Sequence, residues 1–266
     1  MSDTHRRARP LLGTFVEISC RGEAPACHRA IEAAFDAIAR VHALMSVHEK
    51  TSDLSRMNER AHLEPVSIDP QTAYVLRAAL ELHRASDGVF DVAAESRGTS
   101  HDIRLLPGHR VRFAKPMRVN LGGIAKGYAV DRAIGELSSR GITHAIVNAG
   151  GDLRVLGSDA ELIHLRDPGE PVRLHPAFTL AQGAMATSAG YFTRAIVDPA
   201  TGEASGKHDS ASVVAPSAMV ADALAKVVLL RGQATRALLD RYDAHALVLR
   251  AARGTLRALW LPRVPT

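Results

Sequence analysis

The residues best suited to chemistry in this sequence lie between Val119 and Asp131, where two adjacent glycines precede a lysine. A short apolar run leads into Gly122 and Gly123, and Lys126 stands near the start of a helical pattern. Glycines at this point let the backbone approach a ligand, because they carry no Cβ atom. The first turn of a helix offers free N–H groups and the positive end of the helix dipole, which suit a phosphate. The stretch therefore fits a phosphate-binding turn.

The spacing around Lys126 differs from that of the common nucleotide-binding loops. Gly127 follows the lysine, so the Ser or Thr of a P-loop is missing, and the stretch does not match Gly-x-Gly-x-x-Gly either. The same residues fit an ordinary strand-to-helix turn with a solvated lysine equally well. From this stretch alone, both interpretations stay open.

Asp222 is a second candidate, because it interrupts the apolar helical pattern that runs from Val220 to Leu230. A carboxylate among apolar residues needs a cation or hydrogen-bond donors. Lys226 stands one helical turn further on and would form an i,i+4 ion pair with Asp222. A divalent metal ion is the alternative partner, and the pattern of this helix leaves both open.

Other catalytic classes find no support in the sequence. Ser188 is flanked by Ala186 and Gly190, which does not match the Gly-x-Ser-x-Gly pattern of a Ser-His-Asp hydrolase. The 13 histidines are dispersed, without the paired spacing of a zinc site, so we expect most of them at the surface. Cys20 and Cys27 match no zinc motif, and two free thiols are the plainest interpretation.

Composition bounds the class of protein without naming a ligand. The 266 residues can bury a sizeable core, and 46% hydrophobic and 23% charged residues are ordinary for a globular protein. The net charge of +5 suits an anionic small molecule as well as a nucleic acid, so charge does not decide between them. Aromatic residues make up only 4%, which leaves little material for stacking nucleic-acid bases.

The sequence shows no targeting or membrane segment. Met1 to Arg9 is polar and basic, and no apolar stretch of ~7–15 residues follows it as in a signal peptide. No run of ~18 apolar residues that could span a membrane occurs. We therefore expect a cytoplasmic protein as the chain stands, or a periplasmic one if a signal segment has been removed.

The elements that position the candidate residues follow from hydrophobic periodicity and turn residues. Helices are expected over 26–45, 70–85, 220–230 and 234–242, and from the glycine turn to Arg140. Strands are expected over 11–19, 143–148, 153–156, 162–165, 177–181, 211–215, 246–250 and 255–259. Pro107-Gly108 predicts the turn of a hairpin over 104–113, and a turn over 149–152 is expected to close the strand over 143–148. Residues 46–58 and 186–190 are expected as loops, the first with a short helix starting at 52–55.

These elements predict the fold class. Helices and strands do not alternate regularly and hairpins are implied, which favours an α+β fold with mixed or antiparallel sheets over a doubly wound parallel sheet. No internal repeat or clear linker divides the chain. We therefore expect a single compact domain over 11–262, preceded by a flexible, basic N-terminus at 1–10.

In chain order, several segments resemble the signature blocks of the ApbE family, the FAD:protein FMN transferases, also called thiamine biosynthesis lipoproteins. The most distinctive block, Asn120 to Gly127, is similar to the family's Asp-Leu-Gly-Gly-Ile-Ala-Lys-Gly. The other blocks are Leu12 to Phe15, Ser46 to Asn58, Asn148 to Asp152, Ala186 to Ser188, Asp198 to Gly202 and Ala221 to Ala225. Together they cover nearly the whole chain.

The resemblance implies a T-fold-related α+β fold and a reaction on FAD. FMN would move from FAD to a threonine hydroxyl of a target flavoprotein, with release of AMP. The target would carry an Asp-x-x-Thr-Ser/Ala-Thr acceptor motif, and neither a nucleic-acid partner nor a membrane span is implied. FAD is the substrate, and Mg²⁺ would bind at its pyrophosphate.

The resemblance also implies roles for single residues. Asp222 would hold Mg²⁺ together with the carbonyl group of Gly123, and the glycine turn would cradle the pyrophosphate. The catalytic candidates are Lys126, Asp198 and Asp222. The residues expected at the FAD site are Asn58, Gly122, Gly123, Lys126, Asp131, Thr187 and Ser188.

Four positions depart from the family pattern. Lys226 stands where a threonine usually supplies a second metal ligand, so its ammonium could replace the metal ion. Ala195 stands at the family's histidine, which bears on activation of the attacking hydroxyl. Asn120 replaces an aspartate, and His48 replaces an aromatic residue of the early loop. Two alternatives to the transferase follow: a protein that binds FAD or another nucleotide without transfer, and a pyrophosphatase that releases FMN and AMP.

Overall fold

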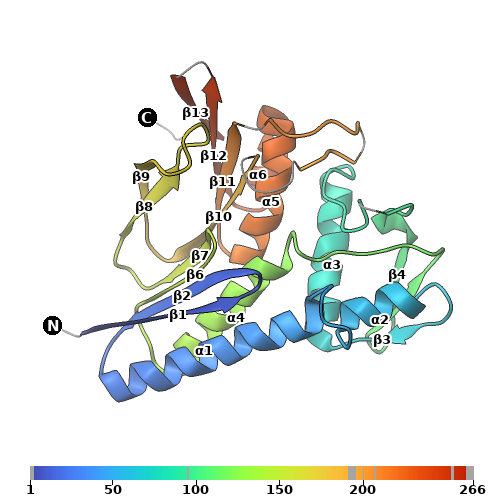
Figure 1. Ribbon diagram of the computed structural model, residues 1–266, viewed down its shortest axis with the longest axis horizontal. Coiled ribbons are helices and arrows are strands. Elements are labelled where there is room, and N and C mark those ends of the chain that lie inside the picture. Colours follow the sequence, from blue (N-terminus) through green and yellow to red (C-terminus); the bar gives the residue numbers. More distant parts are fainter. Residues whose placement is uncertain are drawn as a thin grey trace.

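A computed structural model describes residues 3–94, 96–190, 196–199, 201–206, 208–252 and 255–261. Its centre is an antiparallel sheet of eight strands in the order β1-β2-β6-β7-β10-β11-β12-β13 (Figure 1). These strands are β1 (Thr4–Leu11), β2 (Thr14–Arg21), β6 (Ala145–Ala149), β7 (Asp152–Leu156), β10 (Gly183–Ala189), β11 (Asp209–Ala215), β12 (His245–Ala252) and β13 (Thr255–Leu261). The sheet joins segments from both ends of the chain.

Three helices cover one face of this sheet: α1 (Ala24–Met45), α4 (Ala125–Ser139) and α5 (Ala218–Arg231). Helix α4 contacts both α1 and α5 and packs on β6 and β7, while α5 packs on β10 and β11. The alternation of a strand explains the contact, because Ala184 and Ala186 belong to the core under the helices and Met185 to the opposite side. Such small residues let the nearly all-apolar α5 lie close to the sheet.

A hairpin of β8 (Glu161–Arg166) and β9 (Leu174–Leu180) covers part of the other face. A smaller apolar core lies between this hairpin and the sheet, with Ile163, Leu165 and Leu180 packed together with Leu153 and Leu249. The structure is therefore layered as helices, sheet and hairpin. After α5 the chain continues through a 3-10 turn (Gly232–Thr235) and α6 (Arg236–Arg241) into β12.

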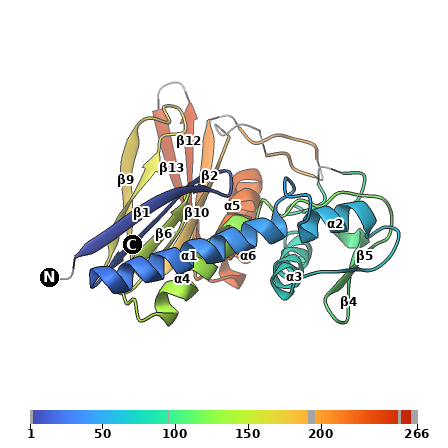
Figure 2. The same cartoon turned by 60° about the horizontal axis from the view of Figure 1, so that its bottom comes forward.

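The segment between α1 and α4 forms a lateral unit beside the main sheet (Figure 2). It contains α2 (Asp53–Arg60), β3 (Val66–Ser67), α3 (Pro70–Ala85), a 3-10 turn (Ser100–Asp102), β4 (Ile103–Leu106) and β5 (Arg110–Phe113). The buried carboxylate of Asp53 ties α2 to α3, because it accepts bonds from the Asp69 N–H and the Thr72 hydroxyl, both at 2.7 Å. The unit belongs to the same apolar core as the helices.

Most predicted elements are confirmed, among them the helix over 70–85 and the hairpin that turns at Pro107-Gly108. The expected α+β class with packed antiparallel sheets is confirmed as well.

Two expectations are wrong. Residues 4–11 form strand β1 rather than a flexible terminus, because every residue of β1 pairs with β2. Residues 186–189 belong to strand β10 rather than a loop, because β7 and β11 flank them. Residue 262, the predicted end of the domain, lies outside the described residues.

The helices were also compared with the length and hydropathy that a bilayer requires. Within the described part of the chain, no helix is both long and apolar enough to cross a membrane.

Candidate active site

The glycine turn is held by hydrogen bonds from the side chains of Asn58 and Asn120 and from the Val92 carbonyl. The side chain of Asn58 binds both polar groups of the Val119 backbone, at 2.9 and 2.7 Å. The Asn120 N–H donates to the Val92 carbonyl at 2.8 Å, and the Asn120 side chain accepts from the Gly122 N–H at 2.9 Å. Helix α4 begins directly after Ile124, and its Ala125 N–H donates to the Leu121 carbonyl at 2.8 Å. The turn is therefore fixed beside the positive end of the α4 dipole, which suits an anionic ligand.

Helices α4 and α5 cross in close contact at Gly127. A Cβ atom at this position would lie 2.1 Å from the Ala218 carbonyl oxygen, so only glycine fits. The crossing lets the Gly127 N–H donate to Asp222 Oδ2 at 3.1 Å. One turn further along α4, Asp131 accepts from the N–H groups of Ala218 and Met219, both at 2.9 Å. Asp131 thus fixes the start of α5 against α4.

Two lysines and two aspartates meet beside this crossing. Lys126 Nζ lies 2.5 Å from Asp152 Oδ2, and Lys226 Nζ lies 2.5 Å from Asp222 Oδ1. Lys226 also donates to the backbone carbonyl of Asp222 at 2.9 Å. Both carboxylates are buried, with 1% of Asp222 and 2% of Asp152 exposed. The four charges balance one another inside the protein, which is the condition for burying them.

Burial and neighbouring charge shift the pKa values of this cluster in different directions. Burial and the Asp222 carboxylate raise the pKa of Asp152 to about 6, against the opposing effect of Lys126. Burial also tends to raise the pKa of Asp222, but the ammonium groups of Lys226 and Lys126 outweigh it and lower that pKa overall. Burial would lower the pKa of Lys126, yet the two carboxylates raise it. Lys126 therefore keeps its positive charge at neutral pH.

A cavity of about 420 Å³ opens above the cluster. Its polar lining comes from Lys126, Asp222 and Lys226 on the helices and from Thr187 and Ser188 at the end of β10. The Thr187 hydroxyl forms a 2.8 Å hydrogen bond with the Ser212 hydroxyl on β11. The rest of the lining is Leu12, Gly13, Thr14, Gly122, Ala149, Gly150, Ala189 and Ile196.

A second cavity of about 280 Å³ adjoins the first one. The two share Leu12, Gly13, Gly122 and Lys126 in their linings. The second cavity continues over the C-terminal end of α1 and the loop after it, where Met45, Ser46 and His48 line it, and it also includes Asn120. Lys126 and Gly122 thus stand at the junction of two adjoining hollows.

The structure brings together only part of the predicted site. Gly122, Lys126, Thr187, Ser188, Asp222 and Lys226 line the first cavity. Asn58 and Asp131 are not among the described residues that line either cavity, and they bind backbone groups behind the glycine turn and at the start of α5. Asp198 is buried and forms an ion pair with Arg231 at 2.6 Å. Ala195 lies outside the described residues.

Asp152 is the main residue whose role at the site the sequence did not predict. It follows two glycines at the start of β7, so it was expected in a turn. The structure buries it and pairs it with Lys126, which stands 26 residues earlier. Gly150 was also expected only as part of a turn. A Cβ atom there would lie 2.6 Å from the Thr14 hydroxyl oxygen, so glycine brings β2 and β6 together at the cavity.

The comparisons with known proteins agree with this geometry. The profile of the ApbE family matches residues 12–100 and 96–248. The FAD:protein FMN transferase of Treponema pallidum is 26% identical and aligns with 86% of this chain and 79% of its own length. The protein of the same name from Vibrio cholerae is 27% identical over 71% of this chain and 69% of its own length. The solved structure of the flavin transferase ApbE from Vibrio cholerae has a TM-score of 0.85 over 98% of each chain at 22% identity, which shows the same fold.

Proposed function

The chain belongs to the ApbE family, and from this premise we propose that it is an FAD:protein FMN transferase. The observation that carries the proposal is the junction of the two cavities at Lys126 and Gly122. FAD has two bulky halves joined by an anionic pyrophosphate. A lysine, a glycine turn and the positive end of the α4 dipole at the junction suit the pyrophosphate, and the two hollows suit the two halves.

The reaction needs an attacking hydroxyl, a phosphorus atom in FAD and a leaving group. In our proposal, the oxygen of a threonine on the target flavoprotein bonds to the phosphorus of the FMN half. The bond from that phosphorus to the oxygen bridging the two phosphates breaks, and AMP leaves with the electron pair. The threonine proton passes to water, and FMN stays attached through a phosphate ester. Negative charge accumulates on the phosphate oxygens, so nearby cations accelerate this step.

Lys126 and Lys226 supply this positive charge in our proposal. Lys126 and Lys226 stand in the lining of the first cavity together with Asp222, which is almost fully buried, whereas Asp152 is not among the described lining residues. The two carboxylates hold the ammonium groups in place at the cavity. Thr187 and Ser188 contribute hydroxyl groups from β10 to the same space. Asp198, through its ion pair with Arg231, fixes the chain next to Ile196 at the cavity wall.

The residues present do not fit a Mg²⁺ ion at Asp222. Its Oδ1 atom and its backbone carbonyl accept from Lys226, and its Oδ2 atom accepts from the Gly127 N–H. An ammonium cannot ligate a cation and repels it, whereas Mg²⁺ requires several oxygen ligands. Within the described residues, no group of three His, Cys, Asp or Glu side chains is arranged to hold a metal ion. We therefore propose that the Lys226 ammonium takes the place of Mg²⁺.

The proposal is tested by incubating the protein with FAD and a target domain that carries the Asp-x-x-Thr-Ser/Ala-Thr motif. We expect covalent flavin fluorescence on the target in a denaturing gel, together with release of AMP. A target whose acceptor threonine is replaced by valine is the matched control and should stay unlabelled. FMN and AMP released equally without a target would indicate a pyrophosphatase instead. FAD binding without labelling of any target would indicate a binding protein, and either result overturns the transferase.

A further inference from the structure

Gly123 stands beside the stem of Lys226, and its missing side chain leaves a small space there. A Cβ atom at Gly123 would lie 3.1 Å from Cε and 3.2 Å from Cδ of Lys226. The same point is 3.5 Å from Cε2 of the Phe90 ring. The Lys226 stem and the edge of the Phe90 ring therefore border the same small space beside the Gly123 Cα atom. We call the three residues Gly123, Phe90 and Lys226 the lysine slot.

We propose that Phe90 and Gly123 are positioning residues, which confine the Lys226 stem so that its ammonium stays on Asp222. The inference rests on the proposed function, in which this ammonium acts on the FAD phosphates. A lysine stem has four rotatable bonds, and fixing it costs side-chain entropy. In the proposal, Phe90 and Gly123 exclude other rotamers of the Lys226 side chain. The ammonium is then held in place before FAD binds, as a preorganised charge in an active site requires.

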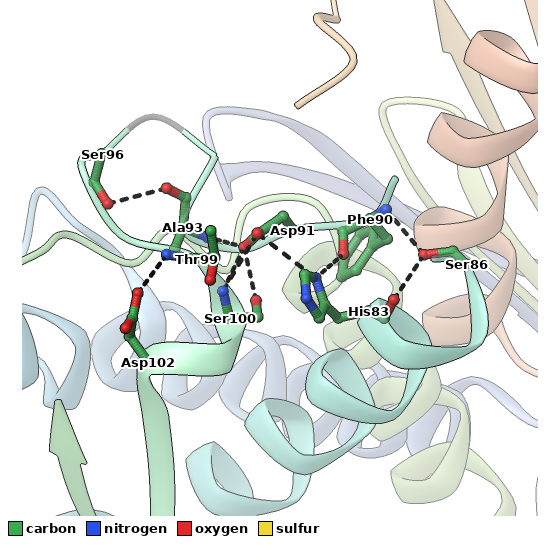
Figure 3. Close-up of polar contacts among 9 residues, drawn as sticks. All are labelled: His83, Ser86, Phe90, Asp91, Ala93, Ser96, Thr99, Ser100 and Asp102. Carbon is green, nitrogen blue, oxygen red and sulfur yellow. Dashed lines mark hydrogen bonds and ion pairs between the residues drawn. The ribbon is translucent and has the colours of Figure 1, made fainter. Parts of the chain in front are cut away.

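The backbone of Phe90 is fixed on both sides by buried groups from α3 (Figure 3). Its N–H donates to the Ser86 hydroxyl at 3.0 Å, and its carbonyl accepts from the His83 ring at Nδ1, also at 3.0 Å. The other ring nitrogen of His83, Nε2, is buried without a hydrogen-bond partner among the described residues. The imidazole therefore forms its hydrogen bond with the Phe90 carbonyl, and the Asp91 carboxylate lies 3.6 Å from the same Nδ1 atom.

Asp91 holds the chain immediately after Phe90. Its Oδ1 atom accepts from the Ala93 N–H at 2.8 Å and from the Ser100 hydroxyl at 2.7 Å (Figure 3). The next residue, Val92, accepts at its carbonyl from the Asn120 N–H at 2.8 Å, directly before the glycine turn. The Phe90 ring is thus fixed relative to both α3 and Gly123. Phe90, Asp91 and the α3 residue His83 are not among the described residues that line either cavity, whereas Asn120 lines the second one. In the proposal, the effect of Phe90 on FAD passes through Lys226.

The first test observes the Lys226 ammonium without FAD. The lysines of the chain are Lys50, Lys115, Lys126, Lys207 and Lys226, so ¹⁵N-lysine labelling gives few Nζ signals, and Lys226→Met assigns the one of interest. We expect that Phe90→Ala and Gly123→Ala broaden the Lys226 signal and leave the Lys126 signal sharp. Lys126 is the internal control, because its ion pair is with Asp152 rather than with Asp222. Equal broadening of both signals would show general loosening, and two sharp signals would show that the slot does not confine Lys226.

The second test measures FAD affinity in a double-mutant cycle, without any target protein. Lys226→Met keeps most of the stem and removes the charge. We expect Phe90→Ala to weaken FAD binding about 10-fold in the wild-type background and hardly at all beside Lys226→Met, because residues that border one shared space couple in such a cycle. Phe90→Leu should restore most of the affinity. Equal losses in both backgrounds would overturn the positioning role. Failure of FMN transfer alone would reject the proposed function and leave both tests of the slot intact.

Discussion

Lys226 Nζ lies 2.5 Å from Asp222 Oδ1, one helical turn away on α5, and it also binds the Asp222 carbonyl. The lysine thereby fills the coordination sites that a metal-binding aspartate would offer. A buried charge pair of this kind is stable only while both partners remain, because removal of one leaves the other uncompensated. In the proposed function, this relationship makes the cation of the site part of the polypeptide, and it leads directly to the first prediction.

Transfer of FMN by the wild-type protein is expected to persist in EDTA, because Lys226 supplies the positive charge. Lys226→Met should lower the transfer rate by about 100-fold or more, as removal of one electrostatic contact to a transition state does. Lys226→Thr should also be inactive in EDTA but regain activity with Mg²⁺, since oxygen ligands would then face the metal. Covalent flavin fluorescence of the target measures all three. Complete loss of wild-type transfer in EDTA would contradict the prediction.

Lys126 is expected to determine FAD affinity, because it stands where the two cavities meet. Lys126→Met should weaken FAD binding roughly 10–100-fold, the range for loss of a hydrogen bond to a charged group. The matched control is Lys50→Met, which removes the same charge from an exposed position. Quenching of flavin fluorescence gives both dissociation constants. Similar losses in the two variants would show that only the net charge matters.

Gly127→Ala should destabilise the fold, because the new methyl group would collide with the Ala218 carbonyl at the α4–α5 crossing. Overpacking of this kind costs about 1–3 kcal/mol, or more where backbone must move. Gly135→Ala is the matched control on the same helix, since nothing lies within 4 Å of its Cβ position. That change should stabilise the protein by about 0.5–1 kcal/mol through helix propensity. Urea unfolding measures both, and a neutral Gly127→Ala would refute the close crossing.

The pH dependence of stability should reveal Asp152. Its pKa is raised from 3.8 to about 6 in the folded protein, so its contribution is full below about pH 3.8 and is lost as the pH rises through about 6. The difference amounts to at most roughly 3 kcal/mol. Asp222 has the opposite sign, because its lowered pKa gives stability that is lost only below the usual carboxyl range.

The measurement compares urea unfolding of the wild-type protein and of Asp152→Asn between pH 4.5 and pH 6.5. We expect the wild-type protein to lose stability with rising pH relative to the variant, which lacks the titrating group. Titrating residues away from the four-charge cluster are common to both proteins and cancel in the comparison. Parallel curves would contradict the assignment of the raised pKa to Asp152.

Local sequence signals predicted much of the fold. Helix α3 begins at Pro70 and ends at Ala85 as expected, because the proline favours its first turn and Gly88 follows its end. The structure adds an N-cap, in which the Asp69 side chain accepts from the Gln71 N–H. The strand β10 was missed because Ala, Thr and Ser at 186–188 resemble a loop in composition. They are small because α5 packs on one side of the strand and a cavity opens at its end. Composition does not distinguish these two causes.

For the site as well, local spacing predicted some features and only the tertiary structure decided others. The sequence by itself determined the glycine turn before Lys126 and the i,i+4 spacing of Asp222 and Lys226, because both are set by neighbours on one helix. Only the tertiary structure decided that Gly127 meets Asp222 across 95 residues and that Asp152 pairs with Lys126. It also placed Asn58 and Asp131 behind the site. Contacts between separate elements depend on how helices and sheet pack, and no spacing along the chain encodes that packing.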